Sequence, residues 1–319
     1  MPLVNVIIPN LNGEALLPIC LGSLRKQTFK EFDITVVDNG SKDGSMGLIV
    51  EQYPEVRTIS LDRNYGFAFA VNRGIEATGS KFVSLLNNDI ELDPNWLKEL
   101  SRALADHPEV GACGPKLLRY RERERINVLG IRLNSNGEVE IIGAGETDRG
   151  QYEEERYVFG VNAGASLYRR SMFDEIGLFD EGFFASFEDV DLSFRAQLAG
   201  YKALYVPAAI GYHMVGATIK RKRYFPTYLN NRNKMLFLWK NLPDEILKKY
   251  FWKIFWNKLG LFSRRVLFNF YKLRTVYFLK GTFAALFRLP FILKDRRRIQ
   301  TMRRVSLDYL ESIMDKDFL

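Results

Sequence analysis

The first hundred residues alternate between short apolar runs and stretches in which apolar residues recur every three or four positions. Apolar runs of this length predict strands that are buried on both faces of a parallel sheet. We expect these strands at 4–8, 34–38, 57–61 and 82–86. The periodic stretches predict amphipathic helices between the strands, at 13–27, 46–53, 67–77 and from Pro94 onward. This alternation is typical of an α/β fold, a mostly parallel sheet flanked by helices.

The pattern changes after about residue 118. The polar and charged stretch 119–156 predicts an irregular insertion rich in hairpins, and further short elements follow it. These are strands at 157–161, 165–168 and 203–206, the last ended by Pro207, and a helix at 189–198. From about residue 225 the chain is helical in pattern, aromatic and basic. We therefore expect one α/β domain over 1–224 and a helical C-terminal region over 225–319.

The chain has 319 residues and a formal net charge of +8, which is distributed unevenly. Residues 1–219 sum to −9, residues 220–304 to +20 and the last fifteen to −3. A basic segment rich in aromatic residues is typical of helices that lie on an anionic membrane surface. The alternatives are packed helices whose lysines and arginines reach outward to solvent, and a nucleic-acid-binding surface. We favour membrane contact because of the charge density and the Trp and Tyr content.

The cysteine content, the N-terminal segment and the length of the apolar runs indicate the cellular compartment. Two cysteines, Cys20 and Cys113, are too few for a disulfide framework and predict a reducing compartment. No charged segment leads into a long apolar run at the N-terminus, so no secretory signal is predicted. No uninterrupted apolar run approaches the roughly 18 residues that a membrane span needs. We expect a cytoplasmic protein that is peripheral to the membrane.

Two of the predicted strands run directly into carboxylates. The strand at 82–86 is followed by Asn87-Asn88-Asp89, and the strand at 34–38 ends in Asp38. Ligands bind at the carboxyl ends of the strands in open α/β sheets, so these acids predict a nucleotide or metal–diphosphate site. For either aspartate taken alone, a turn or a helix cap is the simpler interpretation.

Further candidate groups lie in the second half of the α/β domain. Glu188, Asp189 and Asp191 follow an aromatic segment, and a carboxylate beside aromatic walls can act as a general base. The alternative is that these acids only stabilise the N-terminus of a helix. His213 follows a strand and is either a metal ligand or a packed side chain.

One further loop is a candidate for ligand binding, and the absence of several motifs excludes some classes of enzyme. The loop Arg63-Asn64-Tyr65-Gly66 precedes a predicted helix, and it either meets a base or phosphate or is an ordinary turn. The sequence has no GxGxxG fingerprint, Walker A sequence, CxxC or HExxH motif. The absence of these motifs argues against dinucleotide, P-loop, structural-zinc and zincin chemistry.

Five motifs occur in an order that is specific as a set. They are Val6-Ile7-Ile8-Pro9-Asn10-Leu11-Asn12, Val36-Val37-Asp38-Asn39-Gly40-Ser41 with Asp43-Gly44-Ser45, Arg63-Asn64 with Gly66-Phe67, Leu86-Asn87-Asn88-Asp89, and Glu188-Asp189 with Asp191-Leu192 and Arg195. In this order they resemble family 2 glycosyltransferases over about residues 3–240. The most similar branch is rhamnosyltransferase-like, and it also carries an Arg-Asn pair, like Arg232-Asn233, before an aromatic and basic helical region.

The resemblance implies the GT-A fold, a Rossmann-like sheet with a nucleotide-binding half at about 1–117 and an acceptor half at about 118–224. It implies inverting transfer of a sugar, with rhamnose as the branch-level expectation, from a nucleoside diphosphate to a saccharide or lipid-linked saccharide. The nucleotide sugar would be bound by Pro9, Asn12, Asp38, Arg63, Asn64, Asn87, Asn88 and Asp89. Asp189 would be the catalytic base, and Glu188 and Asp191 would support the acceptor site.

The resemblance also implies a divalent cation, Mg²⁺ or Mn²⁺, bound by Asp89 and His213. Asn87 stands where the family's DxD motif has its first acid, and an amide is a poor cation ligand, so metal binding would depend on Asp89, His213 and the diphosphate. With the basic, aromatic C-terminal region, we expect this enzyme to work on the inner face of the cell membrane without nucleic acid, and a homodimer is a possible assembly. The alternatives are a nucleic-acid-binding protein and a sugar nucleotidyltransferase, although the latter usually carries a basic glycine-rich loop and residues 9–15 contain no Lys or Arg.

Overall fold

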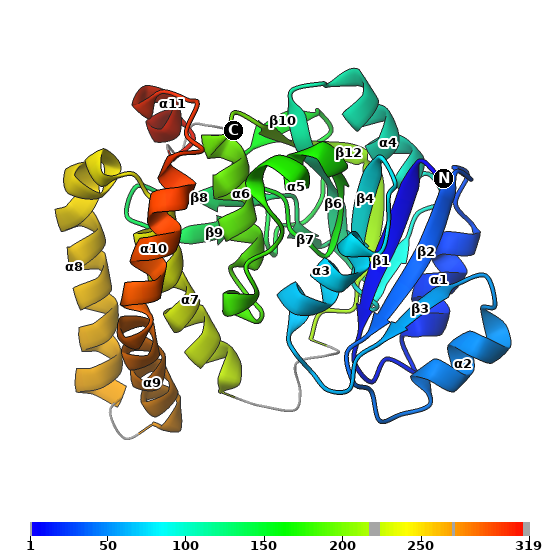
Figure 1. The fold of residues 1–319 in the computed structure, drawn as a ribbon, viewed down its shortest axis with the longest axis horizontal. Helices are drawn as coiled ribbons and strands as arrows, with labels where there is room; N and C mark the ends of the chain where they lie inside the picture. The colour runs from blue at the N-terminus through cyan, green and yellow to red at the C-terminus, as the bar shows by residue number, and fades with distance from the viewer. Residues whose placement is uncertain (1, 217–223, 270–271, 315–319) are drawn as a thin grey trace.

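The computed structural model describes residues 2–216, 224–269 and 272–314. Its centre is one large mixed sheet (Figure 1). The strands are β1 (Val4–Asn10), β2 (Phe32–Asp38), β3 (Arg57–Ser60), β4 (Phe82–Leu86), β5 (Ile90–Leu92), β6 (Val110–Arg119), β7 (Ile126–Val128), β10 (Arg156–Val158), β11 (Ala165–Arg169) and β12 (Lys202–His213). Their order is β10-β12-β6-β11-β4-β1-β2-β3, with β5 on β12 and β7 on β6.

Most of the strands point the same way. β1 pairs in parallel with β2 and β4, β2 with β3, and β6 with β12, whereas β11 lies antiparallel between β4 and β6. The mostly parallel sheet predicted from the sequence is therefore confirmed. Because β1, β2 and β4 are parallel, their carboxyl ends lie at one edge of the sheet, which is where ligands bind in open α/β sheets.

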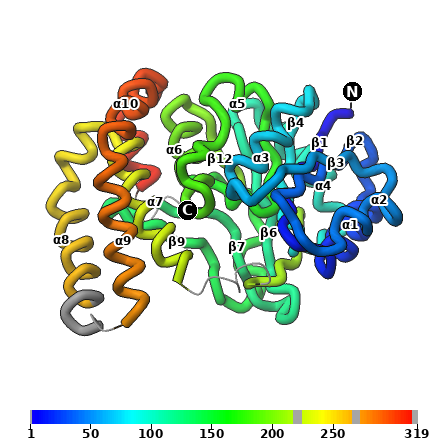
Figure 2. The backbone as a smooth tube through the Cα atoms, turned by 60° about the horizontal axis from the view of Figure 1, so that its bottom comes forward, coloured from blue at the N-terminus to red at the C-terminus, as the bar shows by residue number. Residues whose placement is uncertain are grey.

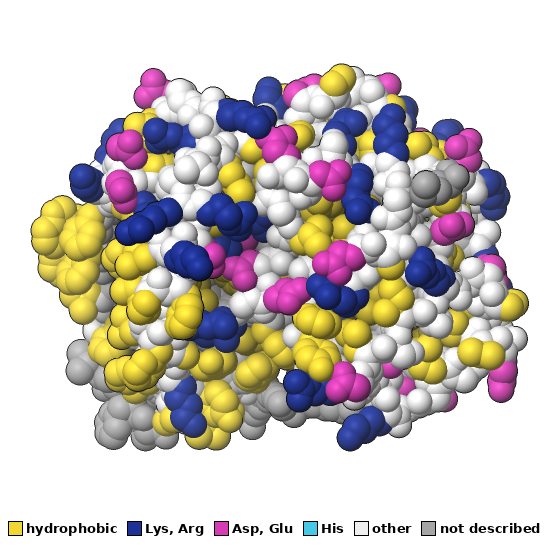
Figure 3. Space-filling model, viewed as in Figure 1, with side chains coloured by type: hydrophobic (Ala, Val, Ile, Leu, Met, Phe, Trp, Pro, Cys, Tyr) yellow, Lys and Arg dark blue, Asp and Glu magenta, His cyan; other side chains and the backbone are white. Residues whose placement is uncertain are grey.

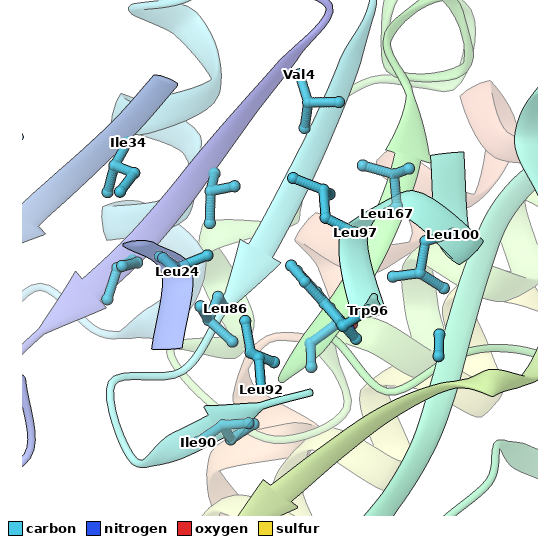
Figure 4. Packing of buried hydrophobic residues seen from close by; sticks show 14 of the residues in the cluster. Val4, Leu24, Ile34, Leu86, Ile90, Leu92, Trp96, Leu97, Leu100 and Leu167 are labelled. Carbon is cyan, nitrogen blue, oxygen red and sulfur yellow. The ribbon is translucent and has the colours of Figure 1, made fainter. Parts of the chain in front are cut away.

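Helices cover both faces of the sheet. They are α1 (Leu17–Arg25), α2 (Ser45–Gln52), α3 (Phe67–Glu76), α4 (Trp96–Asp106), α5 (Arg170–Ile176) and α6 (Glu188–Leu198). Side chains alternate along β1, so Val6 and Ile8 join the core under α1 and α4, while Ile7 joins the core under α3. Figure 4 shows the first of these cores, in which Trp96 of α4 points at the buried strands.

The C-terminal helices form a layer beside the sheet (Figures 1 and 2). They are α7 (Phe225–Asn241), α8 (Asp244–Asn269), α9 (Leu273–Phe287), α10 (Leu289–Gln300) and α11 (Leu307–Ser312). α7 lies innermost, packed against α6 on one side and against α9 and α10 on the other. Phe237 of α7 meets Phe194 of α6 edge to face at a centroid distance of 5.8 Å. The predicted C-terminal helical region is thus present and shares a core with the α/β domain.

The sequence analysis predicts neither β5 nor α5, and two further strands differ from the prediction in ways that bear on the pocket. β6 lies at the centre of the sheet where the pattern predicts no strand, because its glycines and Pro115 interrupt the apolar run. β12 does not end at Pro207 but continues to His213, and a register shift against β6 between Val206 and Ile210 accommodates the proline. This extension matters because it carries His213 to the ligand-binding edge. The expected insertion hairpin is present as β8 (Ile131–Leu133) and β9 (Val139–Ile141).

Candidate active site

A pocket of about 490 Å³ opens at the carboxyl edge of the sheet. It is bordered by the ends of β1, β4 and β12, the start of α3 and the first turn of α6. The predicted site residues that line it are Pro9, Asn64, Asn87, Asn88, Asp89, Glu188, Asp189 and His213. The structure therefore gathers acids and an imidazole from distant parts of the chain around one space. Asn12, Asp38, Arg63 and Asp191 do not line this pocket.

Asp38 lies behind the pocket wall. Its side chain is almost fully buried, its Oδ1 accepts a bond from Nδ2 of Asn10 at 3.1 Å, and its Oδ2 accepts one from the backbone N–H of Ser41 at 3.0 Å. Asn10 in turn accepts a bond from Nδ2 of Asn88 at 2.7 Å. The ends of β1, β2 and β4 are thus joined by side chains, and Asp38 positions the wall from behind through Asn10.

Asn12 and Arg63 lie near this wall without lining the pocket. Asn12 adopts a left-handed backbone conformation, with φ of 52°, and its Oδ1 accepts a bond from the backbone N–H of Lys42 at 2.8 Å. The guanidinium of Arg63 stacks on the ring of Tyr65 at 4.7 Å. Both side chains therefore shape the loops at this edge of the sheet.

The loop before α3 is held by amide side chains. Asn39 donates bonds to Asn64 Oδ1 and to the carbonyl of Gly66, at 3.2 and 3.0 Å, and it accepts one from the backbone N–H of Tyr65 at 2.9 Å. Gly66 has φ of +96°, and a Cβ there would lie 2.5 Å from the carbonyl oxygen of Phe184. Glycine is therefore required at this position by both conformation and space. The result is a rigid turn where the N-terminus of α3 faces the pocket.

Asp89 and His213 form the part of the pocket that could hold a cation. Nε2 of His213 lies 3.4 Å from Oδ1 of Asp89, and Nδ1 of His213 lies 2.8 Å from Oδ1 of Asn127. When Nδ1 donates to Asn127, Nε2 presents its lone pair toward Asp89, which is the orientation of a metal-binding imidazole. Within the described ranges, no group of three or more His, Cys, Asp or Glu side chains is arranged to hold a metal. A cation bound here would therefore need further ligands from a bound molecule or from water.

Glu188 and Asp189 begin α6 on the opposite wall. Oδ2 of Asp189 accepts a bond from Asn162 at 3.3 Å, and its Oδ1 accepts one from the backbone N–H of Val190 at 2.9 Å. Burial raises the pKa of Asp189 to about 6. Burial, together with the neighbouring Asp189 charge, raises the pKa of Glu188 to about 8. Among the described residues, Oε2 of Glu188 is buried without a hydrogen-bond partner.

Asp191 does not line the pocket, although the sequence predicts that it supports the acceptor site. Its carboxylate points away from the pocket and is fully buried between Arg195 Nε at 2.9 Å and Lys240 Nζ at 2.8 Å, with Asn241 Nδ2 at 2.8 Å. Burial opposes ionisation, but the two cations and the bond from Asn241 together lower the pKa of Asp191 to about 2. It lies in the same first turn of α6 as the two acids that line the pocket, so its place in the sequence gave no indication of its different surroundings.

Sequence reasoning also missed residues that shape the site. Asn127 and Asn162 orient the two chemically reactive side chains, and Phe184, Ala185 and Ser186 form part of the pocket wall. Single amides in loops carry no recognisable spacing, so a lone sequence gives no signal for them. The aromatic segment 182–187 as a whole did give a signal, because it directly precedes Glu188 and Asp189 in the sequence.

The chain was compared with known protein families and relatives. Residues 5–177 match the family model described as glycosyl transferase family 2. The chain is 31% identical over 212 residues to an N-acetylglucosaminyl-diphospho-decaprenol L-rhamnosyltransferase of Mycobacterium tuberculosis, covering 59% of this chain and 68% of that protein. It is 24% identical to a putative glycosyltransferase, EpsH, of Bacillus subtilis, covering 70% of this chain and 64% of that protein.

Solved structures are similar at the level of the fold. A mannosyltransferase from Pyrobaculum calidifontis in complex with GDP-Man and Mn²⁺ has a TM-score of 0.57 and 18% identity, covering 98% of this chain and 86% of that one. GalNAc-T7 with UDP, GalNAc and Mn²⁺ has a TM-score of 0.63 and 17% identity, covering 79% of this chain and 50% of that one. At these identities the likeness establishes the fold, and the expected GT-A fold is confirmed.

Proposed function

The chain belongs to glycosyl transferase family 2, and from this premise we propose that it transfers a sugar from a nucleoside diphosphate to an acceptor hydroxyl in one inverting displacement. The observation that carries the proposal is a single pocket with two chemically different walls. One wall has Asp89 and His213 at strand ends, where a diphosphate and its cation fit. The other wall has Asp189, a carboxylate of raised pKa at the start of α6.

Asp189 is the general base in this proposal. Its carboxylate takes the proton of the acceptor hydroxyl while the hydroxyl oxygen bonds to the anomeric carbon and the bond from that carbon to the diphosphate breaks. A base with a pKa near the working pH is the most effective, and the burial of Asp189 moves its pKa in that direction. Glu188 keeps its proton at neutral pH, so its neutral carboxyl can hydrogen-bond the acceptor rather than repel the charge on Asp189.

The proposal places Mg²⁺ or Mn²⁺ on Asp89 and His213. Carboxylate and imidazole together suit a borderline divalent ion such as Mn²⁺, and Asn127 orients the imidazole for this role. When bound, the cation would neutralise the charge of the leaving diphosphate. Two structurally similar enzymes are described with Mn²⁺, which supports a divalent cation here.

The donor and acceptor are proposed from the relatives. The relative from M. tuberculosis is named as a rhamnosyltransferase acting on a diphospho-decaprenol-linked sugar. We therefore propose rhamnose from a nucleoside-diphosphate donor, and a polyprenyl-diphosphate-linked saccharide as acceptor. No observation favours nucleotidyl transfer or nucleic-acid binding, the two other functions considered from the sequence.

A lipid-linked acceptor fits the surface of the C-terminal helices, which we propose to bind an anionic membrane. Large apolar side chains are exposed there, on α8 (Phe251, Trp252, Phe255, Trp256, Leu259, Phe262), α9 (Val276, Phe283, Leu286, Phe287) and α10 (Phe291, Leu293). Figure 3 shows hydrophobic side chains over these helices at the left and lower left, with Lys and Arg between them. Apolar side chains can enter the headgroup boundary while cations meet anionic lipid, placing the enzyme on the inner face of the cell membrane.

No single helix in the described parts of the chain has the length and apolar character to cross a bilayer, although α9 and α10, bent by 61° at their junction, pass that test as a pair.

The function is tested by a donor screen. The purified protein is heated with thymidine-diphosphate rhamnose, uridine-diphosphate N-acetylglucosamine or guanosine-diphosphate mannose, each with Mg²⁺, Mn²⁺ or a chelator, and then assayed for transfer to a lipid-linked saccharide. We expect one donor to raise the melting temperature with cation and to support transfer. A protein that binds no nucleotide sugar under any of these conditions would contradict the proposal.

A further inference from the structure

The segment 182–187, which leads into Glu188 and Asp189, has an unusual backbone. Phe184, Ser186 and Phe187 have φ of 65°, 67° and 71°. These values lie in the left-handed region, which residues with side chains rarely adopt, so the surrounding structure must impose them. Phe184, Ala185 and Ser186 line the pocket. The conformation of this segment therefore sets both the pocket wall and the start of the helix that presents the proposed base.

Asn233 of α7 binds this segment from behind. Its Nδ2 lies 2.9 Å from the carbonyl oxygen of Phe183, 2.9 Å from that of Ala185 and 2.6 Å from that of Ser186. The side chain is fully buried. One amide nitrogen thus satisfies carbonyl groups that a strained turn directs inward, away from water.

Arg232 completes the arrangement. Its Nε donates to Oδ1 of Asn233 at 2.8 Å, which fixes the amide so that its nitrogen faces the segment. Its Nη2 donates to the carbonyls of Gly182 at 3.0 Å and Phe183 at 2.9 Å. The planar guanidinium makes all these bonds at once, which a lysine ammonium cannot do from one position.

The segment also touches the nucleotide-binding half. The carbonyl of Phe184 accepts a bond from the backbone N–H of Ala68, in the first turn of α3, at 3.3 Å. Gly66, which lines the pocket beside Asn64, makes room for that carbonyl. A shift of the segment would therefore displace residues on both walls of the pocket.

We propose that Arg232 and Asn233 are positioning residues, a clamp that holds the segment 182–187 so that Asp189 meets the acceptor hydroxyl in the pocket. This proposal rests on the proposed function and deepens it, because it makes the first C-terminal helix a structural part of the active site. The clamp acts through the backbone carbonyls of the segment, and neither residue lines the pocket.

The test compares Asn233→Ala with Asn231→Ala in the full-length enzyme. Asn231 is a matched control on the same helix, because its Nδ2 donates to the Phe278 carbonyl and Thr282 hydroxyl of α9, at 2.8 and 2.7 Å, and not to the segment. For Asn233→Ala we expect kcat to fall by about a hundredfold, as misplaced catalytic groups lose rate steeply. The dissociation constant of the donor should stay within about twofold. The acidic limb of the kcat profile should move to lower pH, because a loosened segment admits water to Asp189.

Arg232→Lys is the second variant, and it keeps the proposal testable if Asn233→Ala does not fold. It preserves the charge and loses the simultaneous bonds, so kcat should fall while the donor affinity is retained. For the control Asn231→Ala we expect the wild-type kcat and an unchanged acidic limb of the pH profile. The same result in a folded Asn233→Ala or Arg232→Lys variant would overturn the proposed clamp. Such a result leaves the proposed function intact as long as the wild type transfers sugar, whereas a wild type without transfer would contradict the function itself.

Discussion

At the scale of single residues, the site works by giving adjacent or facing side chains different surroundings. Glu188, Asp189 and Asp191 lie within four positions, yet burial raises the pKa of the first two and the cations Arg195 and Lys240 lower the pKa of the third. On the other wall of the pocket, His213 is oriented by Asn127 toward Asp89. In the proposed mechanism, the same residue types would thus serve as a neutral hydrogen-bonding acid, a base, a structural ion and a cation ligand.

The raised pKa of Asp189 predicts an acidic limit for the reaction. The base must be ionised to accept a proton, so kcat should fall as the pH drops through about 6, whereas an ordinary aspartate would keep its charge to about pH 4. The measurement is kcat against pH at saturating donor and acceptor. A rate that stays constant down to pH 5 would contradict the role given to Asp189.

The orientation of His213 predicts a graded loss of cation binding. His213→Ala removes a ligand and should strongly weaken the Mn²⁺ dependence of donor binding, while Asn127→Ala removes only the orienting partner and should weaken it by about tenfold or more. Calorimetric titration of Mn²⁺ with the donor nucleotide present measures both. If both variants bind Mn²⁺ as the wild type does, the histidine is only structural.

At the scale of elements, α6 is the connection between catalysis and fold. Its first turn presents Glu188 and Asp189 to the pocket, and in the same turn Asp191 ties it to α7 through Lys240. Arg195 continues this interior network by donating to the carbonyls of Ile176 and Leu178, both at 2.8 Å. These buried ion pairs and hydrogen bonds hold α6 in place. Its N-terminal acids are thereby kept at the pocket.

Breaking the ion pair of Asp191 predicts a large loss of stability. Asp191→Asn should lower the free energy of unfolding by about 3–5 kcal/mol, because the buried cations lose their charge partner. Glu55→Gln is the control, since its pair with Arg25 is exposed and should matter little. Because the pKa of Asp191 is lowered, its stabilisation is present above about pH 4 and is lost as the pH falls toward 2. Equal denaturant midpoints for the two variants would refute this account.

At the scale of the whole molecule, the charge is divided between the two layers of the fold. The acidic α/β domain carries the pocket, and the basic helical layer carries exposed aromatic side chains on α8 to α10. α7 lies between them and contacts both. A membrane beneath the helical layer would bring a lipid-linked acceptor to the same molecule that binds a soluble donor.

The membrane proposal predicts that exposed tryptophans drive binding. The double substitution of Trp252→Ser with Trp256→Ser should reduce sedimentation with vesicles containing phosphatidylglycerol by about tenfold or more, because both rings are more than half exposed on α8. Val50→Ser removes an equally exposed apolar side chain from α2 and should leave binding unchanged. Unaltered sedimentation of the double variant would contradict the proposed surface.

Much of the fold could be predicted because β1, β2 and β4 are mostly apolar and the apolar residues of the helices between them recur every three or four positions. β6 and the end of β12 could not, since glycine and proline interrupt their patterns and only the neighbouring strands decide the pairing. The site residues that lie at strand or helix ends, such as Asp89 and Asp189, carried a positional signal. Asp191 was misjudged and Asn127 missed because their surroundings come from residues far away in sequence.

The most direct measurement of the central claim compares transfer rate and donor affinity in Asp189→Asn. The substitution keeps the size of the side chain and removes the base, so transfer should fall by about 10²–10⁴-fold while the donor dissociation constant changes by less than about twofold. A variant that still turns over at the wild-type rate, or that loses donor affinity in proportion to its rate, would contradict the assignment of the base.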